Sequence, residues 1–276
     1  MALLEPVPDE PAAIATLDGD RALVVADYHA GYEVGLRYER GVDVPSQASA
    51  RRERLCGLLE RSNADQLIVL GDLMHAIGDP GGAERGELEV LFESVPSDVT
   101  VTLVRGNHDG AIESWIDTDA AGFEDYVFGV VGRIGGTTLR ITDGSGVRLG
   151  DLGCCHGHTW PDRSVLEADV VCLGHEHPCV RLEDEVGGAR VERVWLRGRL
   201  APDPFLEREV YAGLPWLEGE EPTPQVVVVP AFNDLAGGTW TNLEGQSFLT
   251  PFIPAGIADT EAYLLDGTRL GPLDRI

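Results

Sequence analysis

Five short polar clusters, placed at the ends of apolar runs, constrain this chain more than any other feature of its sequence. The clusters span residues 27–29, 71–75, 106–109, 156–158 and 174–177, and all seven histidines of the 276-residue chain fall inside them. A lone histidine is more often a hydrogen-bonded core residue than a ligand. Five clusters that together use every histidine are instead typical of a metal site, and we predict one here.

The first half of the chain alternates apolar, strand-like runs with helical patterns. Strands are expected at 22–26, 66–70 and 99–104, and helices at 84–95 and at 46–61 with Ser46 as the N-cap. Each of these strands runs into a polar cluster. Because ligands of open α/β sheets bind outside the carboxyl ends of the strands, this placement predicts a shared site.

The second half is richer in strands. Short strands are expected at 126–131, 137–142, 147–153, 169–173, 180–182, 191–195 and 225–229. Residues 197–224 are rich in proline and charge, which predicts a surface excursion. Because histidine clusters occur in both halves, we predict one domain over residues 1–276 with the site at the seam between the halves.

The net charge of the chain indicates the salt concentration in which it works, and says less about its binding partners. It carries 47 acidic and 21 basic residues, a formal net charge of −26, and every basic residue is arginine. An acidic surface without lysine suits molar intracellular salt, where the Debye length shrinks to about 3 Å and screens self-repulsion. We therefore predict a halophilic protein, and at such salt the charge does not exclude a nucleic-acid substrate.

Neither a membrane span nor a secretory signal is expected. The purely apolar runs are far shorter than the ~20 residues that a spanning helix requires. The first residues also have no basic start, so a cytoplasmic location is predicted.

The residue types in the clusters predict the chemistry of the site. Carboxylate, imidazole and amide oxygen suit Mn²⁺, with Zn²⁺ or Fe²⁺ as alternatives, and the lack of thiolate argues against a closed structural zinc. Two ions about 3.5–4 Å apart can clamp the attacking and leaving oxygens of a phosphate. Asp72, on a tight turn after a strand, is the candidate bridging carboxylate. A hydroxide between the ions would attack, and His108 is placed to protonate the leaving oxygen.

The order and spelling of the clusters (D-x-H, GD, GNHD, H-x-H and GHxH) resemble the calcineurin-like metallophosphoesterases. The resemblance implies an α/β fold, a four-layer αββα sandwich of two mixed β-sheets flanked by helices, and hydrolysis of phosphate esters by two divalent metal ions. The implied ligands are Asp27, His29 and His177 for the first metal, Asn107, His156 and His175 for the second, and Asp72 for both.

The same resemblance implies that His108 is the general acid, oriented by Asp109 or by Asp72. Within the H-x-H element His156 matches the family's ligand, while His158 stays open as an alternative. His75, where many members carry an acid or asparagine, is either a substrate contact or a supporting residue. Arg105 is either a phosphate contact or part of a surface salt bridge.

Three further segments narrow the resemblance. Residues 174–178 (GHEHP), 229–233 (VPAFN) and 262–267 (AYLLDG) resemble small archaeal phosphoesterases related to the SbcD nuclease subunit, which are similar to DNA-ligase-associated phosphoesterases of bacteria. The subgroup implies a phosphodiester substrate, either nucleic acid or a nucleotide, and no obligate protein partner is indicated. The alternatives are a phosphomonoesterase with the same centre and a catalytically inactive metal-binding interaction module.

Overall fold

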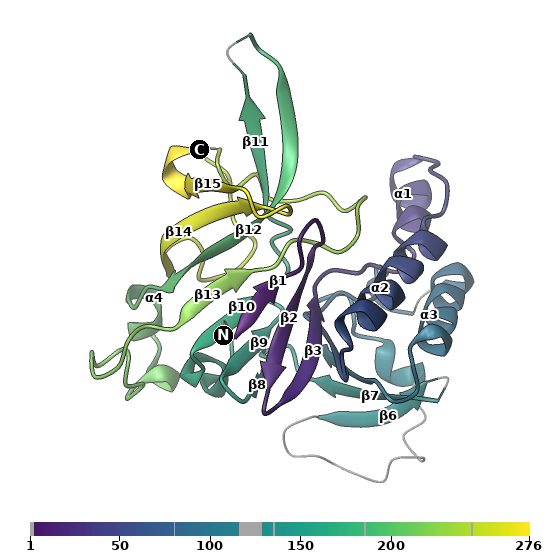
Figure 1. The fold of residues 1–276 in the computed structure, drawn as a ribbon, viewed down its shortest axis with the longest axis horizontal. Helices are drawn as coiled ribbons and strands as arrows, with labels where there is room; N and C mark the ends of the chain where they lie inside the picture. The colour runs from purple at the N-terminus through teal and green to yellow at the C-terminus, as the bar shows by residue number, and fades with distance from the viewer. Residues whose placement is uncertain (1–2, 80, 116–128, 135, 185, 244) are drawn as a thin grey trace.

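Two mixed β-sheets form the centre of the molecule (Figure 1). The structure, a computed structural model, describes residues 3–79, 81–115, 129–134, 136–184, 186–243 and 245–276. The first sheet has seven strands in the order β1-β2-β3-β4-β5-β7-β6, and the second has the order β15-β14-β12-β13-β10-β9-β8, with β11 paired to β12. The fold class expected from the motifs is thereby confirmed.

The strands of the first sheet are β1 (Leu4–Pro6), β2 (Ala12–Leu17), β3 (Asp20–Val25), β4 (Gln66–Val69), β5 (Thr100–Val104), β6 (Val130–Ile134) and β7 (Thr137–Thr142). Strands β3, β4, β5 and β7 run parallel, while β2 and β6 pair antiparallel to their neighbours. Strands β3 and β4 are buried on both faces after their first residues, so they include continuous apolar runs in the sequence, whereas β7 alternates buried and half-buried residues.

The strands of the second sheet are β8 (Val147–Leu149), β9 (Leu152–Cys155), β10 (Val170–Leu173), β11 (Cys179–Glu183), β12 (Ala189–Leu200), β13 (Gln225–Val228), β14 (Ile257–Leu264) and β15 (Arg269–Pro272). Strand β10 pairs parallel with both β9 and β13. The β11–β12 hairpin projects from the body of the molecule (Figure 1).

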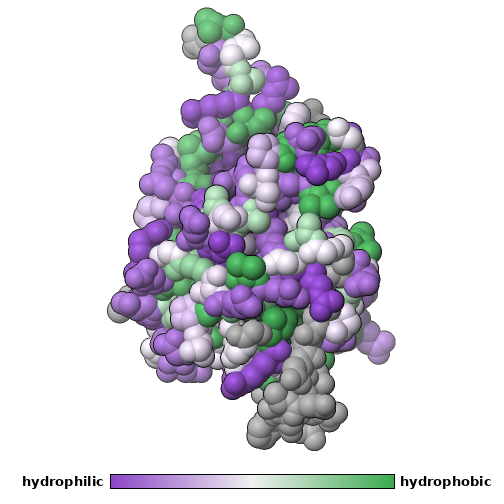
Figure 2. Space-filling model, turned by 90° about the vertical axis from the view of Figure 1, so that its right-hand side faces the viewer, coloured by the Kyte–Doolittle hydropathy of each residue, from purple (hydrophilic) through white to green (hydrophobic). Residues whose placement is uncertain are grey.

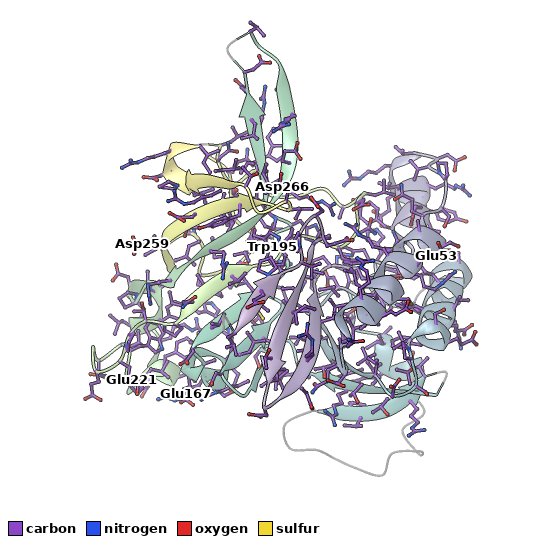
Figure 3. The ribbon with its side chains drawn as sticks, viewed as in Figure 1. Glu53, Glu167, Trp195, Glu221, Asp259 and Asp266 are labelled. Atoms are coloured by element: carbon purple, nitrogen blue, oxygen red, sulfur yellow. The ribbon has the colours of Figure 1, made fainter. Side chains whose placement is uncertain are left out.

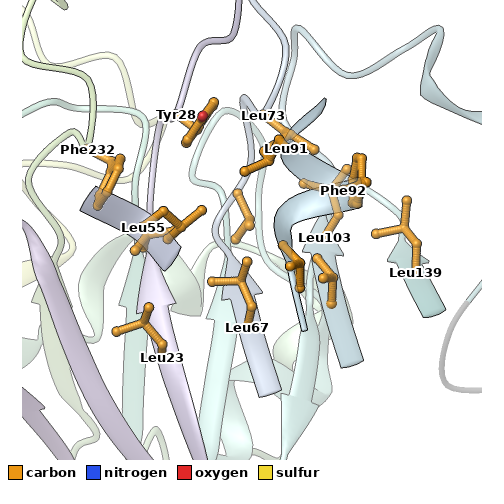
Figure 4. Packing of buried hydrophobic residues seen from close by; sticks show 14 of the residues in the cluster. Leu23, Tyr28, Leu55, Leu67, Leu73, Leu91, Phe92, Leu103, Leu139 and Phe232 are labelled. Atoms are coloured by element: carbon orange, nitrogen blue, oxygen red, sulfur yellow. The ribbon is translucent and has the colours of Figure 1, made fainter. Parts of the chain in front are cut away.

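Helices α1 (Tyr32–Arg40), α2 (Ala48–Ser62) and α3 (Gly82–Ser94) lie together on one side of the molecule (Figure 1). Leucines of α2 and α3 pack on the first sheet, where Leu55 and Leu91 meet Leu23 and Leu67 (Figure 4). The outer face of the second sheet is covered by shorter turns, namely α4 (Asp203–Leu206), η2 (Arg163–Glu167) and η3 (Glu209–Tyr211). Two further 3₁₀ turns are η1 (Ile112–Trp115) and η4 (Leu273–Arg275).

Alternate residues of the same strand enter different cores, as the period of two requires. Leu23 and Val25 of β3 pack toward the helices, whereas Val24 packs between the two sheets. Trp195 of β12 lies in this middle layer, 1% exposed, and it is seen near the centre of Figure 3. The middle layer therefore joins the two sheets along most of their inner faces.

Several expected elements differ from the observed ones. The expected strand 147–153 is two strands, β8 and β9, which turn back on each other at Gly150. The expected strand 191–195 is part of the longer β12, so the excursion expected at 197–224 begins after Leu200. Phe205 and Tyr211 in that excursion are buried against the second sheet, because aromatic area outweighs the proline and charge around it. The part of the expected strand 126–131 before residue 129 lies outside the described residues.

The N-cap of helix α2 lies one residue later than the sequence predicts. The N-cap position is Gln47, not Ser46, and its amide donates to Glu33 Oε1 at 2.7 Å. The Ser46 hydroxyl still accepts an amide of this helix start, that of Ala48 at 3.3 Å, so a local and a tertiary acceptor act side by side.

The surface is acidic and largely hydrophilic. Figure 2 shows hydrophilic residues spread over one face, with hydrophobic ones scattered among them. Three labelled acids, Glu167, Glu221 and Asp259, lie toward the left and lower left edge of the molecule in Figure 3. In the described part of the chain, no helix is both long and apolar enough to cross a bilayer.

A buried ion cluster ties the three larger helices together. The Arg51 side chain of α2 is 4% exposed and contacts Glu33 of α1 at 3.2 Å and Glu87 of α3 at 2.7 Å. The second oxygen of Glu87 accepts the amide of Gly31 at 2.8 Å. Loss of the arginine would leave two carboxylates uncompensated inside the protein.

We predict that Arg51→Ala lowers the free energy of unfolding by about 3–5 kcal/mol, the usual cost of breaking a buried ion pair. The matched control is Arg85→Ala, whose exposed pair with Glu89 should change it by about 0.5 kcal/mol or less. Urea denaturation of both variants in one buffer measures the difference. Equal losses in the two variants would contradict the role of the cluster.

Candidate metal centre

The polar clusters meet at one edge of the two sheets. Asp27, Asp72 and Asn107 follow β3, β4 and β5 of the first sheet, and His156 and His175 follow β9 and β10 of the second. The carboxyl ends of parallel strands share one edge, so the sheets bring these side chains to a common seam.

A first group of possible ligands consists of Asp27, His29 and His177, whose donor atoms lie within 4.8 Å of one another. His177 Nε2 lies 3.2 Å from Asp27 Oδ1, and 3.4 Å from His29 Nε2. Asp27 is fully buried and His29 is 3% exposed. One carboxylate and two imidazoles at these distances form a donor set that suits a divalent transition metal.

A second group consists of Asp72, His156 and His175, again within 4.8 Å of one another. Asn107 joins this group, because its Oδ1 lies 3.2 Å from His156 Nε2. The amide oxygen adds a neutral donor to the carboxylate and the two imidazoles. His29, His75 and His108 also lie with their donor atoms within 4.8 Å of one another, so His29 belongs to two such groups.

Asp72 lies between the groups. Its Oδ2 is 3.8 Å from His29 Nε2 in the first group and 3.4 Å from His156 Nε2 in the second. Its other oxygen accepts the amide of His108 at 3.0 Å, which fixes the carboxylate in this direction. A single oxygen is thus close to both sets of imidazoles.

The backbone of the site is strained. Nine described residues other than glycine have a positive φ, and five of them carry the site: Asp27, His29, Asp72, His175 and His177, with φ between 44° and 68°. Left-handed backbone costs each such residue on the order of 1–3 kcal/mol and persists where surrounding structure enforces it. This concentration at one seam is typical of a functional site.

Three histidines are held so that Nε2 points to the seam. The Nδ1 atoms of His156 and His177 donate to the carbonyls of Leu70 and Gly237, both at 2.7 Å, and His29 Nδ1 donates to Met74 at 3.3 Å. In the neutral form of each ring, a carbonyl on Nδ1 selects the tautomer whose Nε2 lone pair is free, as metal-binding histidines require.

Charges at the seam compensate each other. Burial opposes ionisation of Asp27 and Asp72. His177 outweighs this effect at Asp27 and His156 outweighs it at Asp72, so the pKa of each carboxyl is lowered. Burial likewise opposes protonation of His156, but Asp72 and Asp27 raise its pKa to about 9. Burial lowers the pKa of His29 to about 3 and that of His175 to about 4, so both are neutral donors near pH 7.

His108 borders the first group. Its Nδ1 donates to the backbone carbonyl of His75, and its Nε2 lies 3.8 Å from Asp72 Oδ2. The ring is therefore fixed at one end and faces the seam with the other. Its side chain is 19% exposed, so a bound molecule can reach it.

Asp109 differs from the expectation that it orients His108. One of its oxygens accepts the amide of Met74 at 3.0 Å and the other accepts the amide of Gly106 at 2.9 Å. No hydrogen bond among the described residues joins the Asp109 carboxylate to the His108 ring. Burial, followed by the charge of Asp72, raises the pKa of Asp109 to about 6. Asp109 shapes the backbone under the site, and the groups facing His108 are Asp72 and the His75 carbonyl.

The three residues left open by the sequence occupy different places. The His75 ring stacks on His108 at 5.6 Å between centroids, and His158 lies 5.3 Å from His156 and 6.1 Å from His175. Arg105 pairs with Glu113, as its salt-bridge alternative expects. His75 and His158 therefore flank opposite ends of the ligand set.

Sequence reasoning missed three buried residues that hold the turns of the site. Glu84 accepts the amides of His75 and Ala76, and Asn233 Nδ2 donates to the carbonyls of Tyr28 and His29. Glu176 accepts the Thr239 hydroxyl at 2.9 Å. Two of them stand in segments quoted for the resemblance, 174–178 and 229–233, but Glu84 shows no signal beyond its place in a helix.

Comparison with known proteins agrees with this geometry. The model of the calcineurin-like phosphoesterase family matches residues 21–179. Among solved structures, the nuclease MPE of Pseudomonas putida is similar over 97% of this chain and 100% of its own, with 21% identity and a TM-score of 0.50, which bears on the fold alone. No curated protein matches the chain in sequence.

Two further solved structures show weaker similarity. Yfce, a phosphoesterase from E. coli, matches over 59% of this chain and 73% of its own, with 21% identity and a TM-score of 0.31. A predicted phosphoesterase from Streptococcus pneumoniae TIGR4 matches over 91% and 92%, with 13% identity and a TM-score of 0.29.

Gly106 offers a test of the site that leaves every ligand in place. A Cβ at this position would overlap the amide and carboxylate of Asp72, whereas nothing lies within 4 Å of a Cβ at Gly110. We predict that Gly106→Ala weakens Mn²⁺ binding at least tenfold, the usual effect of disturbing a ligand's support, and that Gly110→Ala does not. Isothermal titration calorimetry on folded variants measures both. Wild-type affinity in Gly106→Ala would contradict the placement of Asp72.

Proposed function

The chain belongs to the calcineurin-like phosphoesterase family, and from this premise we propose that it hydrolyses phosphodiesters with two divalent metal ions. Membership makes it a metal-dependent phosphoric ester hydrolase. The finer statement, two ions and a diester substrate, is our proposal. The observation that carries it is the position of Asp72 Oδ2 between the two histidine groups, 3.8 Å from His29 and 3.4 Å from His156.

In this proposal the ligands divide as the two groups do. Asp27, His29 and His177 hold one ion, and Asn107, His156 and His175 hold the other. Asp72 contacts both. His156 is preferred to His158 as the ligand because its Nδ1 is bound to Leu70 O and its Nε2 faces Asn107. Mn²⁺ is the proposed metal, since mixed oxygen and imidazole donors suit it.

The bound ions would supply an activated water and withdraw charge from the phosphate. The chain itself would supply the proton for the leaving oxygen. His108 Nδ1 donates to the His75 carbonyl, so its proton for the leaving group resides on Nε2, which faces the seam. Asp72 lies beside that Nε2. Asp109 supports the backbone of the site by accepting the Met74 and Gly106 amides.

We further propose that the diester belongs to a nucleic acid or a nucleotide. Two observations support this: the resemblance of three segments to SbcD-related archaeal phosphoesterases, and the nuclease named among the solved structures of this fold. The net charge of −26 would repel such substrates at low salt. In the halophilic setting that we propose for the lysine-free surface, molar salt screens this repulsion.

The diester preference can be measured directly. We predict that kcat/KM for bis-p-nitrophenyl phosphate exceeds that for p-nitrophenyl phosphate when both are assayed with Mn²⁺ in molar KCl. Both substrates release the same alcohol, so the ratio reports the phosphate that the site accepts. A strong preference for the monoester would refute the diesterase proposal and favour a phosphatase. Failure to turn over either ester would favour an inactive metal-binding module.

The role of His108 predicts a dependence on the leaving group. For a dinucleotide, whose alkoxide needs a proton, His108→Gln should lower kcat by about 10²–10⁴-fold. For bis-p-nitrophenyl phosphate the loss should be much smaller, because nitrophenolate departs without a proton. The Mn²⁺ content should stay at the wild-type level, whereas Asp72→Asn should lose metal. Equal losses on both substrates would contradict the acid role.

A further inference from the structure

An aromatic surface lies beside His108. The rings of Tyr32, His75 and His108, here called the aromatic wall, contact one another in that order. Tyr32 and His75 lie 4.7 Å apart between centroids at 52°, and His75 stacks on His108 at 5.6 Å and 13°. None of the three is fully buried. Tyr32 belongs to none of the motifs and has no part in the chemistry proposed above.

The backbone of Tyr32 is firmly held. It is the first residue of α1, and its amide donates to the carbonyl of His29 at 3.2 Å. The preceding amide, of Gly31, is bound by the buried Glu87, and the following residue, Glu33, pairs with Arg51. Its ring also lies 5.9 Å from that of His29. The backbone that carries the Tyr32 ring is thus fixed, and the ring itself contacts His29 and His75.

Helix α1 is shaped to admit the middle ring of the wall. A Cβ at Gly35 would overlap the His75 imidazole, so the absence of a side chain there lets the ring lie against the helix. From the other side, the His75 and Ala76 amides are bound to Glu84 of α3. The wall is therefore built from three elements that converge on His108.

We propose that the aromatic wall binds the nucleoside that leaves when the diester is cut. This inference rests on the proposed function, because a general acid stands next to the leaving oxygen and the rest of the leaving group must extend from there. A flat base stacks on aromatic rings whatever its identity, because every base has a π-face. Tyr32 is the substrate-binding residue at the outer end of the wall.

Thymidine 5′-(methyl phosphate) tests the proposal by internal competition. Water attacks phosphorus and one P–O bond breaks, so the products are thymidine with methyl phosphate, or methanol with thymidine monophosphate. The two leaving alcohols are both primary and differ mainly in the nucleoside. The product ratio is independent of enzyme concentration and metal loading. Thymidine 3′-(methyl phosphate), assayed in parallel, tests an enzyme that expels the nucleoside through its 3′ oxygen instead of its 5′ oxygen.

We expect wild-type enzyme to expel thymidine preferentially from at least one isomer. Tyr32→Ala should lower the ratio of thymidine to methanol about tenfold, in line with the loss of one stacking contact. Tyr32→Phe keeps the ring and should keep the ratio. The matched control is Tyr38→Ala, a tyrosine of the same helix that is 83% exposed, and its ratio should equal the wild-type one.

An unchanged ratio in folded Tyr32→Ala would overturn the proposal, even if the total rate fell, because a purely structural role lowers both products together. Wild-type enzyme that cleaves bis-p-nitrophenyl phosphate but releases neither alcohol from the methyl esters would overturn it as well. Wild-type enzyme that cleaves none of these diesters would instead mean that the proposed function itself is wrong.

Discussion

The hydrogen bonds from the His175 amide to the two oxygens of Asp27, at 3.2 and 3.1 Å, fix the geometry on which the rest of the site depends. They join the end of β3 in the first sheet to the end of β10 in the second. Asp27 is fully buried and stays ionised because His177 and His156 lie beside it. A buried charge without such partners costs several kcal/mol, so the carboxylate that we propose as a metal ligand also sets the position of one sheet against the other.

The left-handed turns at the seam are kept in place by buried side chains that bind the backbone. Asp109 binds the amides of Met74 and Gly106, Glu84 binds those of His75 and Ala76, and Asn233 binds the carbonyls of Tyr28 and His29. Buried backbone groups that found no partner would each cost about 1–3 kcal/mol, so these bonds offset the strain of the turns. This explains why Asp109, although it follows His108 directly, serves the backbone and not the imidazole.

The sequence predicts the parallel strands and the clusters behind them because both are local. A buried parallel strand is a continuous apolar run, as at 22–26 and 66–70, and the residues after it emerge at the site whatever the rest of the chain does. Helix α1 could not be predicted in this way. It begins after Gly31, whose φ is 78°, and it is held by the Glu33–Arg51 pair, which joins residues 18 positions apart. The buried aromatics of 201–224 were missed for a similar reason, since their partners lie on distant strands.

His75 links the local and the distant parts of this design. Its carbonyl fixes His108, its amide is held by α3, and its ring lies between His108 and α1. The contact of the His75 carbonyl with His108 depends on the turn after β4. The contact of the His75 ring with Gly35 depends on α1. Exchange of residues on α1 can therefore change what lies beside the His75 ring without moving His108, the proton donor of our proposal. In a family defined by its strand-end motifs, the elements without motif signals are then the ones in which substrate preference can vary while the chemistry stays constant.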